Sequence, residues 1–145
     1  MVGTTRGWLV TLLLGGLVLV RVAGALAQSV DPDVEAAGRV VLQQLEAFRH
    51  DDFTTAYTFA SVYIRQMFDR GSFEKMVRGG YPEIARSSSA TVDGHRRGDA
   101  GEIYLFVRVR GSNGRTIEAV YELIPEGGGW RINGVVARPD SGDTA

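Results

Sequence analysis

The chain has 145 residues, of which 44% are hydrophobic and 23% charged, a composition typical of one globular domain and too short for two separate cores. It contains no cysteine, which excludes a disulfide framework, a thiol nucleophile and a zinc–thiolate site. The formal net charge at pH 7 is −1, so no basic excess points to nucleic acid as a partner.

Residues 1–27 have the three parts of a secretory signal peptide. Arg6 supplies the positive start, Gly7–Val20 a mostly apolar stretch, and Ala25-Leu26-Ala27 an A-x-A cleavage site. Cleavage after Ala27 predicts a periplasmic or secreted protein. The apolar stretch is shorter than the roughly 20 residues of a membrane span, but Arg21 is unusual so close to a cleavage site. An uncleaved membrane anchor is therefore the alternative, and only that form would bring a membrane partner.

The first half of the mature chain has helical periodicity. Asp31-Pro32-Asp33-Val34-Glu35 combines a capping residue, a proline suited to the first helical position and acidic residues in the first turn, which predicts a helix start. The apolar stripe of this helix is Val34, Ala37, Val41, Leu45 and Phe48. Shorter helical pieces are predicted after Asp52, Ser61 and Ser72. We expect the last piece to end at Gly79-Gly80 through positive φ angles.

The second half alternates with a period of two, which predicts strands at about residues 87–92, 103–110, 116–123 and 130–137. Gly94–Gly101 is expected to be a polar loop, and Pro139–Ala145 a disordered tail. The fold class predicted is α+β, with the N-terminal helices packed on one face of a curved antiparallel sheet of about four strands. A single domain is expected to span residues 28–138.

Turn residues and side-chain alternation together predict the register of two hairpins. A three-residue loop Ser112-Asn113-Gly114 places Val109 opposite Ile117, Val107 opposite Ala119 and Arg108 opposite Glu118. A turn at Glu126-Gly127 would place Leu123 opposite Trp130, Tyr121 opposite Ile132 and Glu122 opposite Arg131. The core face of the sheet is then expected to carry Ile103, Leu105, Val107, Val109, Ile117, Ala119, Tyr121, Leu123, Trp130, Ile132 and Val136.

Catalytic chemistry has little support in this pattern. The predicted core face has one phenol, no carboxylate and no histidine. We expect His50 and His95 to lie solvated at helix-end or loop positions, and Asp51-Asp52 to cap a helix. No metal-ligand spacing, nucleophile–base pair or phosphate-binding glycine loop is present, so no catalytic residue, metal or cofactor is predicted.

Aromatic residues favour a binding cleft instead. The predicted ligand-contacting side chains are Tyr63, Tyr81, Tyr121 and Trp130, with Arg65 as a charged anchor and a small apolar molecule as the ligand. The alternative for these aromatic residues, as for Tyr57, is that they simply fill the core. A second alternative is an enzyme of isomerase or dehydratase type, in which Asp69 and a tyrosine serve as acid and base.

Four segments resemble a known family: Gln44–Ser61, Ile64–Phe68, Met76–Pro82 and Trp130–Val135. They are similar to a bacterial exported family of unknown function, domain family 4864, and more broadly to nuclear-transport-factor-like domains. The resemblance implies a cone-shaped α+β domain in a periplasmic or secreted location, and it implies no established activity. Related cones include isomerases, dehydratases and plain binding modules.

The same resemblance suggests a homodimer formed through the outer face of the sheet. That face is expected to carry apolar side chains and two charge pairs, Arg108–Glu118 and Glu122–Arg131, and an ordinary solvated face is the alternative. The apolar members are Tyr104, Phe106, Val120 and Val135. We therefore expect an exported, non-catalytic module that binds a small ligand or a protein partner, with a purely structural domain as a further alternative.

Overall fold

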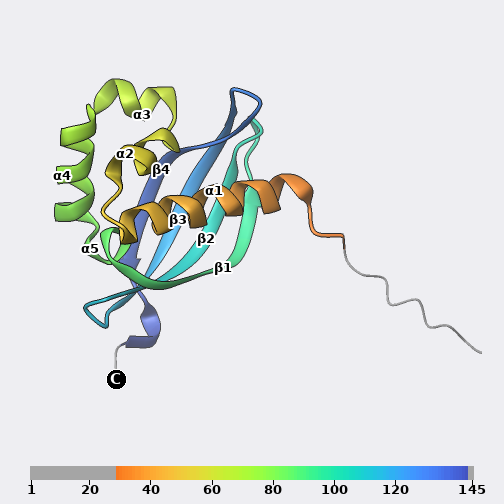
Figure 1. Cartoon of the computed structure of the whole chain (residues 1–145). Helices are drawn as coiled ribbons and strands as arrows, with labels where there is room; N and C mark the ends of the chain where they lie inside the picture. The colour runs from red at the N-terminus through yellow and green to blue at the C-terminus, as the bar shows by residue number, and fades with distance from the viewer. Residues whose placement is uncertain (1–28, 144–145) are drawn as a thin grey trace, which may run out of the picture.

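The computed structural model describes residues 29–143, and the expected signal peptide lies outside them (Figure 1). Within that range five helices precede four strands and a final 3₁₀ turn. The helices are α1 (Pro32–Arg49), α2 (Phe53–Thr58), α3 (Val62–Met67), α4 (Arg70–Gly80) and α5 (Pro82–Ala85). The strands are β1 (Ser87–Arg97), β2 (Ile103–Gly111), β3 (Thr116–Glu126) and β4 (Gly129–Pro139), and the 3₁₀ turn is Ser141–Asp143. The α+β fold class is confirmed.

The helices begin at side-chain caps, as three of the sequence signals predict. Asp31 accepts a hydrogen bond from the Asp33 N–H at 3.0 Å, and Asp52 accepts one from the Thr55 N–H at 2.9 Å. The Ser61 hydroxyl accepts one from the Ile64 N–H at 3.2 Å. Each cap satisfies a backbone donor that the first turn of a helix leaves without a partner.

The prediction for α4 was wrong at its start and in the reason for its end, although the expected end at Gly79-Gly80 is confirmed. Asp69, not Ser72, is the N-cap, and its carboxylate accepts a hydrogen bond from the Ser72 N–H at 2.7 Å. Gly79 and Gly80 belong to the helix and neither has a positive φ. The helix ends at Gly80 because of Pro82, since a proline disfavours helical geometry in the residue before it and suits the first position of α5.

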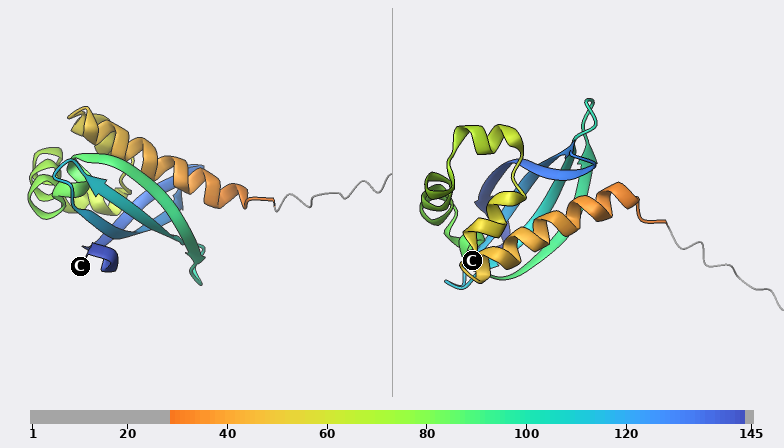
Figure 2. Two further views of the ribbon diagram at one scale, coloured as in Figure 1. Left: turned by 90° about the horizontal axis from the view of Figure 1, so that it is seen from below. Right: turned by 45° about the horizontal axis from the view of Figure 1, so that its top comes forward.

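The four strands form one antiparallel sheet in the order β1-β2-β3-β4, and the helices lie on one of its faces (Figures 1 and 2). Helix α1 crosses the sheet from β1 to β4. Its predicted stripe is buried at Ala37, Val41, Leu45 and Phe48, against the inward-facing side chains of the strands. These inward positions alternate along β2 and β3, as predicted for a half-buried sheet.

The β2–β3 hairpin has the predicted register. Val109 pairs with Ile117, Val107 with Ala119, and Arg108 with Glu118. Gly114 has φ +82°, as the loop chemistry requires.

The β3–β4 hairpin differs from its prediction. Its turn is Gly127-Gly128, with φ values of +62° and +76°, and it pairs Glu126 with Gly129. A two-residue turn with both φ angles positive favours glycine at both positions. The expected turn at Glu126-Gly127 would have placed Glu126 at a positive φ, which is strained for a residue with a side chain. Leu123 therefore pairs with Ile132 rather than Trp130.

An irregularity in β4 shifts the register a second time. The pairing skips Asn133 between Ile132 and Gly134, so Tyr121 lies opposite Val135 and Glu122 opposite Gly134. The extra residue reverses the alternation beyond it. Val135 consequently packs against the core, while Val136, expected inside, is 71% exposed on the outer face.

Strands β1 and β4 both extend further toward their C-terminal ends than expected. Strand β1 continues through His95 to Arg97, paired with β2, so the predicted polar loop is confined to the residues after Arg97. At the other end Pro139 still belongs to β4, and the Asp140 N–H donates to the Thr116 carbonyl at 3.2 Å. The ordered chain thus passes residue 138, the boundary predicted for the domain.

Candidate functional site

A cavity of about 290 Å³ lies between the helices and the β3–β4 end of the sheet. Its helical walls come from α1, α3, α4 and α5, and its sheet wall from β3 and β4. Apart from Gln44 and two tyrosines, the lining is apolar side chains and Gly134. The lining side chains are Gln44, Phe48, Ala60, Ile64, Phe68, Phe73, Met76, Val77, Tyr81, Ile84, Tyr121, Ile132 and Val135.

Two of the predicted ligand-contacting residues, Tyr81 and Tyr121, line this cavity. Tyr121 is 1% exposed, and its hydroxyl has no hydrogen-bond partner among the described residues. Burial, with a smaller effect of the nearby Tyr81 phenol, raises the pKa of Tyr121 far above its ordinary value, so the hydroxyl stays protonated. It therefore offers an unused hydrogen-bond donor in an apolar wall.

The Tyr81 hydroxyl is engaged, because it donates to the Val135 carbonyl at 3.3 Å. This contact joins the end of α4 to β4 beyond the irregularity at Asn133. The three residues that share this corner, Tyr81, Tyr121 and Val135, therefore give the cavity a polar region on the sheet side.

Gln44 is a lining residue that the sequence analysis missed. It is 4% exposed on α1, and its Nε2 donates to the Ala56 carbonyl at 3.2 Å. The signal was present in the sequence: Gln44 lies three residues after Val41 and four before Phe48, and so on the buried face of the helix. A polar residue at such a position has a buried amide that needs partners.

The other predicted site residues lie elsewhere. Tyr63 and Arg65 are exposed on α3, and Trp130 lines a separate hollow beside the Gly127–Gly129 turn. Asp69 is exposed as the cap of α4 and does not line the cavity. Hydrogen bonds from Ser72 hold the pKa of Asp69 below its usual range, which suits a helix cap. The alternative enzyme therefore lacks its proposed acid–base partner at the cavity.

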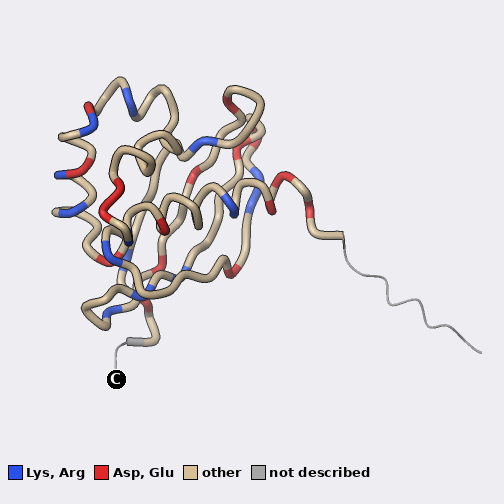
Figure 3. Tube along the Cα trace, viewed as in Figure 1, with Lys and Arg blue, Asp and Glu red and all other residues tan. Residues whose placement is uncertain are grey.

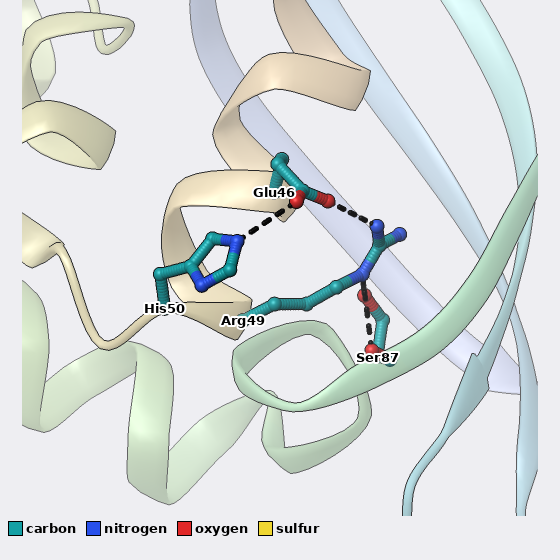
Figure 4. A network of polar contacts seen from close by, with 4 residues as sticks. All are labelled: Glu46, Arg49, His50 and Ser87. Carbon is teal, nitrogen blue, oxygen red and sulfur yellow. Dashed lines mark hydrogen bonds and ion pairs between the residues drawn. The ribbon is translucent and has the colours of Figure 1, made fainter.

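The polar contacts around His50 form a structural link on the surface (Figure 4). His50 Nε2 lies 2.9 Å from Glu46 Oε1, and Arg49 bonds the other oxygen of Glu46. Arg49 Nε also donates to the Ser87 carbonyl and hydroxyl, at 3.1 and 3.0 Å. Hydrogen bonds from His50 and then Arg49 keep the pKa of Glu46 below its usual range. The network ties the end of α1 to the start of β1.

The outer face of the sheet does not carry the predicted charge pairs. Arg108 bonds Asp93 at 2.9 Å and lies 3.6 Å from Asp140, while Glu118 bonds Arg138 at 2.8 Å. The shifted register of β4 places Val136 on this face in place of Val135. Self-association through this face stays a prediction.

Two further features bear on function within residues 29–143. No group of three or more His, Asp or Glu side chains is arranged to hold a metal ion. No helix in this part of the chain combines the length and the hydropathy that a membrane span requires.

A family model described as "Domain of unknown function (DUF4864)" matches residues 30–145. The chain belongs to this family. The resemblance found in the sequence is thereby confirmed at family level, while the nuclear-transport-factor-like cone stays a prediction. The match covers all of the helices and strands of this DUF4864 domain.

No curated protein matches the DUF4864 domain. Among solved structures, it is similar to the solution structure of a SEC-C motif containing protein from Rhodopseudomonas palustris. The two are 14% identical with a TM-score of 0.45, and the alignment covers 72% of this chain and 90% of that one. A likeness at this level indicates no shared function.

Proposed function

We propose that this DUF4864 domain is a non-catalytic binding module that encloses a small, uncharged, largely apolar molecule in the cavity between its helices and its sheet. The observation that carries the proposal is the Tyr121 hydroxyl, a buried donor that has no partner among the described residues and belongs to a side chain lining an apolar cavity. A buried polar group without a partner is costly, and a ligand oxygen would supply the missing acceptor.

The chemistry of the lining narrows the ligand. None of the described lining residues has a carboxylate, an imidazole, an ammonium or a guanidinium group, so nothing there pairs with a charged ligand. The volume of about 290 Å³ lies at the lower end for small-molecule sites. A neutral molecule with one carbonyl, ether or hydroxyl oxygen fits both the size of the cavity and the unpartnered donor of Tyr121.

The lack of an acid–base pair in the lining favours binding over catalysis. A proton-transfer enzyme needs a base within reach of its substrate. Burial raises the pKa of Tyr121, so its hydroxyl stays protonated and cannot accept a proton, and the Tyr81 hydroxyl already donates a hydrogen bond to the Val135 carbonyl.

The test uses a matched pair of ligands on the chain from residue 28 onward, which contains every described element. N-phenyl-1-naphthylamine, a neutral dye that fluoresces in apolar surroundings, reports occupancy, and benzophenone or diphenylmethane displaces it. Benzophenone has the carbonyl acceptor that diphenylmethane lacks. We expect benzophenone to bind several-fold more tightly, the effect of one neutral hydrogen bond, and Tyr121→Phe to abolish the preference.

A variant that fills the cavity supplies the second half of the test. Met76→Trp enlarges a lining side chain on α4 and should lower dye affinity at least tenfold, whereas Leu42→Trp, at an exposed position on α1, should not. Absence of saturable dye binding, or equal affinity in these two variants, would refute the proposal. A preference for benzophenone that persists in Tyr121→Phe would remove the tyrosine from the site.

Export belongs to the same proposal. It is supported by the A-x-A site ending at Ala27 and by the family match, which begins at residue 30. The chain recovered from the cells that produce it should have the mass of a protein that starts at Gln28. Ala27→Phe should block that processing, and an unprocessed wild-type chain would favour the membrane anchor.

A further inference from the structure

Helix α3 covers one side of the cavity, yet none of its own residues is buried. Ile64 in α3 and Phe68 after it line the cavity from the inside. On the outside Val62, Tyr63 and Met67 are exposed by 45%, 59% and 56%. They are three of the seven large apolar side chains that are exposed within residues 29–143, gathered on a helix of six residues. The helix is therefore apolar toward the cavity and toward solvent.

The helix is held mainly at its ends. The Val62 N–H donates to the Glu126 carboxylate at 3.1 and 3.2 Å, and Ser61 caps the first turn. The Tyr57 hydroxyl lies 2.6 Å from the Phe68 carbonyl oxygen and 3.1 Å from that of Arg65. Few packed side chains therefore hold the helix between these ends, and a segment with so few buried contacts opens at low cost.

Basic side chains that have no ionic partner within residues 29–143 lie on this helix and on α4. Among the described residues the Arg65 guanidinium forms no ion pair or hydrogen bond, and Arg70 bonds only the Thr54 hydroxyl, at 3.0 Å. Lys75 likewise forms no ion pair there. Most arginines elsewhere are paired with carboxylates, as Arg97 is with Asp31 at 2.6 Å. Figure 3 shows basic positions on α3 and along α4.

Nearby carboxylates offset only part of this charge. Asp69 accepts a hydrogen bond from the Ser72 N–H, and Glu74 pairs with Arg78 at 2.9 Å. Glu126 is engaged by the backbone of Val62. The surface of α3 and the first turn of α4 therefore combines exposed apolar side chains with unpaired cations, the combination that binds to anionic lipid surfaces.

We propose that this surface, formed by Val62, Tyr63, Arg65, Met67 and Arg70, docks on an anionic lipid bilayer, and that the cavity exchanges its ligand with the bilayer through α3. Docking on the bilayer is inferred from this surface alone, whereas ligand exchange with the bilayer also rests on the proposed function.

A second copy of the chain fits this surface less well. A stable interface buries about 800 Å² on each partner, which three partly exposed side chains on a short helix do not provide. A symmetric dimer would also bring the unpaired cations of the two copies together, whereas lipid phosphates neutralise them.

Vesicle flotation with the chain from residue 28 onward tests the docking. We expect binding to vesicles of phosphatidylglycerol and phosphatidylcholine in equal parts, weakened by salt, with little binding to phosphatidylcholine alone. Arg65→Gln should weaken binding about fivefold, and Tyr63→Asp should abolish it. The matched controls are Arg110→Gln, another exposed arginine without an ion pair, and Val136→Asp, the most exposed apolar side chain of the sheet; both should bind as the wild type does.

Failure to float with anionic vesicles would overturn the docking proposal, as would equal binding by Tyr63→Asp and Val136→Asp. A dimer that Tyr63→Asp dissociates, without vesicle binding, would assign the surface to a second copy and refute it too. For the exchange, transfer of N-phenyl-1-naphthylamine from the protein should speed up with vesicle concentration in the wild type and not in Tyr63→Asp. A chain that floats normally but never binds the dye refutes the proposed function and the exchange, and leaves the docking standing.

Discussion

The substitution Tyr121→Phe should stabilise the ligand-free chain, although it removes a polar atom from the core. The Tyr121 hydroxyl is buried and has no partner among the described residues, so folding takes it out of water without compensation. The cost of such a group is about 1–3 kcal/mol. Phenylalanine has nearly the same shape, so the change leaves no cavity in the surrounding core. We therefore expect the free energy of unfolding to rise by about 1–3 kcal/mol.

Urea unfolding of the chain from residue 28 onward measures this change, with Tyr81→Phe as the control. The Tyr81 hydroxyl donates to the Val135 carbonyl, so its removal should lower stability by about 0.5–1.5 kcal/mol, a change of opposite sign. In a thermal scan each kcal/mol corresponds to roughly 4 °C for a domain of this size. A Tyr121→Phe variant less stable than the wild type would refute the reasoning, because it would show that the hydroxyl already has a partner in the ligand-free protein.

Three further changes test the local structure. Gly79→Ala should add about 0.5–1 kcal/mol to the free energy of urea unfolding, since Gly79 is helical and an added Cβ meets no atom within 4 Å; a loss of stability would mean that this turn requires glycine. Gly111→Ala should cost about 1–3 kcal/mol, because a Cβ would lie 2.6 Å from Asn113 and 2.9 Å from Glu83, and unchanged stability would show that the hairpin yields freely. Acid should lower the free energy of unfolding below about pH 4, because hydrogen bonds hold the pKa of three capping carboxylates below their ordinary range and their stabilisation is lost on protonation. The three carboxylates are those of Asp31, Asp52 and Asp69. If the free energy of unfolding depends on pH with the same slope after all three are changed to Asn, this explanation is contradicted.

The helical caps and the β2–β3 hairpin could be predicted because their determinants are local. A cap needs a short polar side chain next to an apolar stripe, and Asp31, Asp52 and Ser61 each meet that condition. Ser72 met it as well, but Asp69, three residues earlier, met it better and began the helix one turn sooner. Where two candidate N-caps lie within one turn of each other, the packing of the whole helix determines which of them begins it. The spacing of residues in the sequence does not show that packing.

The candidate site was only partly predictable because the aromatic residues have similar signals in the sequence. Tyr81 and Tyr121 line the cavity, whereas Tyr63 and Trp130 have the same chemistry and lie outside it. Whether a tyrosine faces a cavity depends on how the helices sit over the sheet, which involves residues far apart in the chain. The unpartnered hydroxyl of Tyr121 is a property of that packing, and no local pattern indicates it.

The irregularity in β4 explains why Val135, on the sheet side of the cavity, escaped prediction. Simple alternation would place Val136 inside and Val135 outside, and the extra residue Asn133 exchanges them. The same residue contacts the start of helix α3: Asn133 Oδ1 accepts a hydrogen bond from the Ser61 hydroxyl at 2.8 Å, and that hydroxyl caps α3.

Backbone hydrogen bonds also connect the edge strand β4 to the segment just before α3. The Ser61 N–H donates to the Ile132 carbonyl, and the Ile132 N–H donates to the Phe59 carbonyl, both at 2.8 Å. These bonds cover an edge strand that would otherwise be open to pairing with another chain. The inserted residue Asn133 thus turns Val135 into the cavity wall and helps to anchor the start of α3, while its neighbour Ile132 pairs with the chain before α3 and protects the edge of the sheet. Asn133 therefore belongs to the architecture of the site. Its sequence did contain a signal, because Asn133-Gly134 is unfavourable inside a strand and a glycine in a strand pattern often marks a bulge.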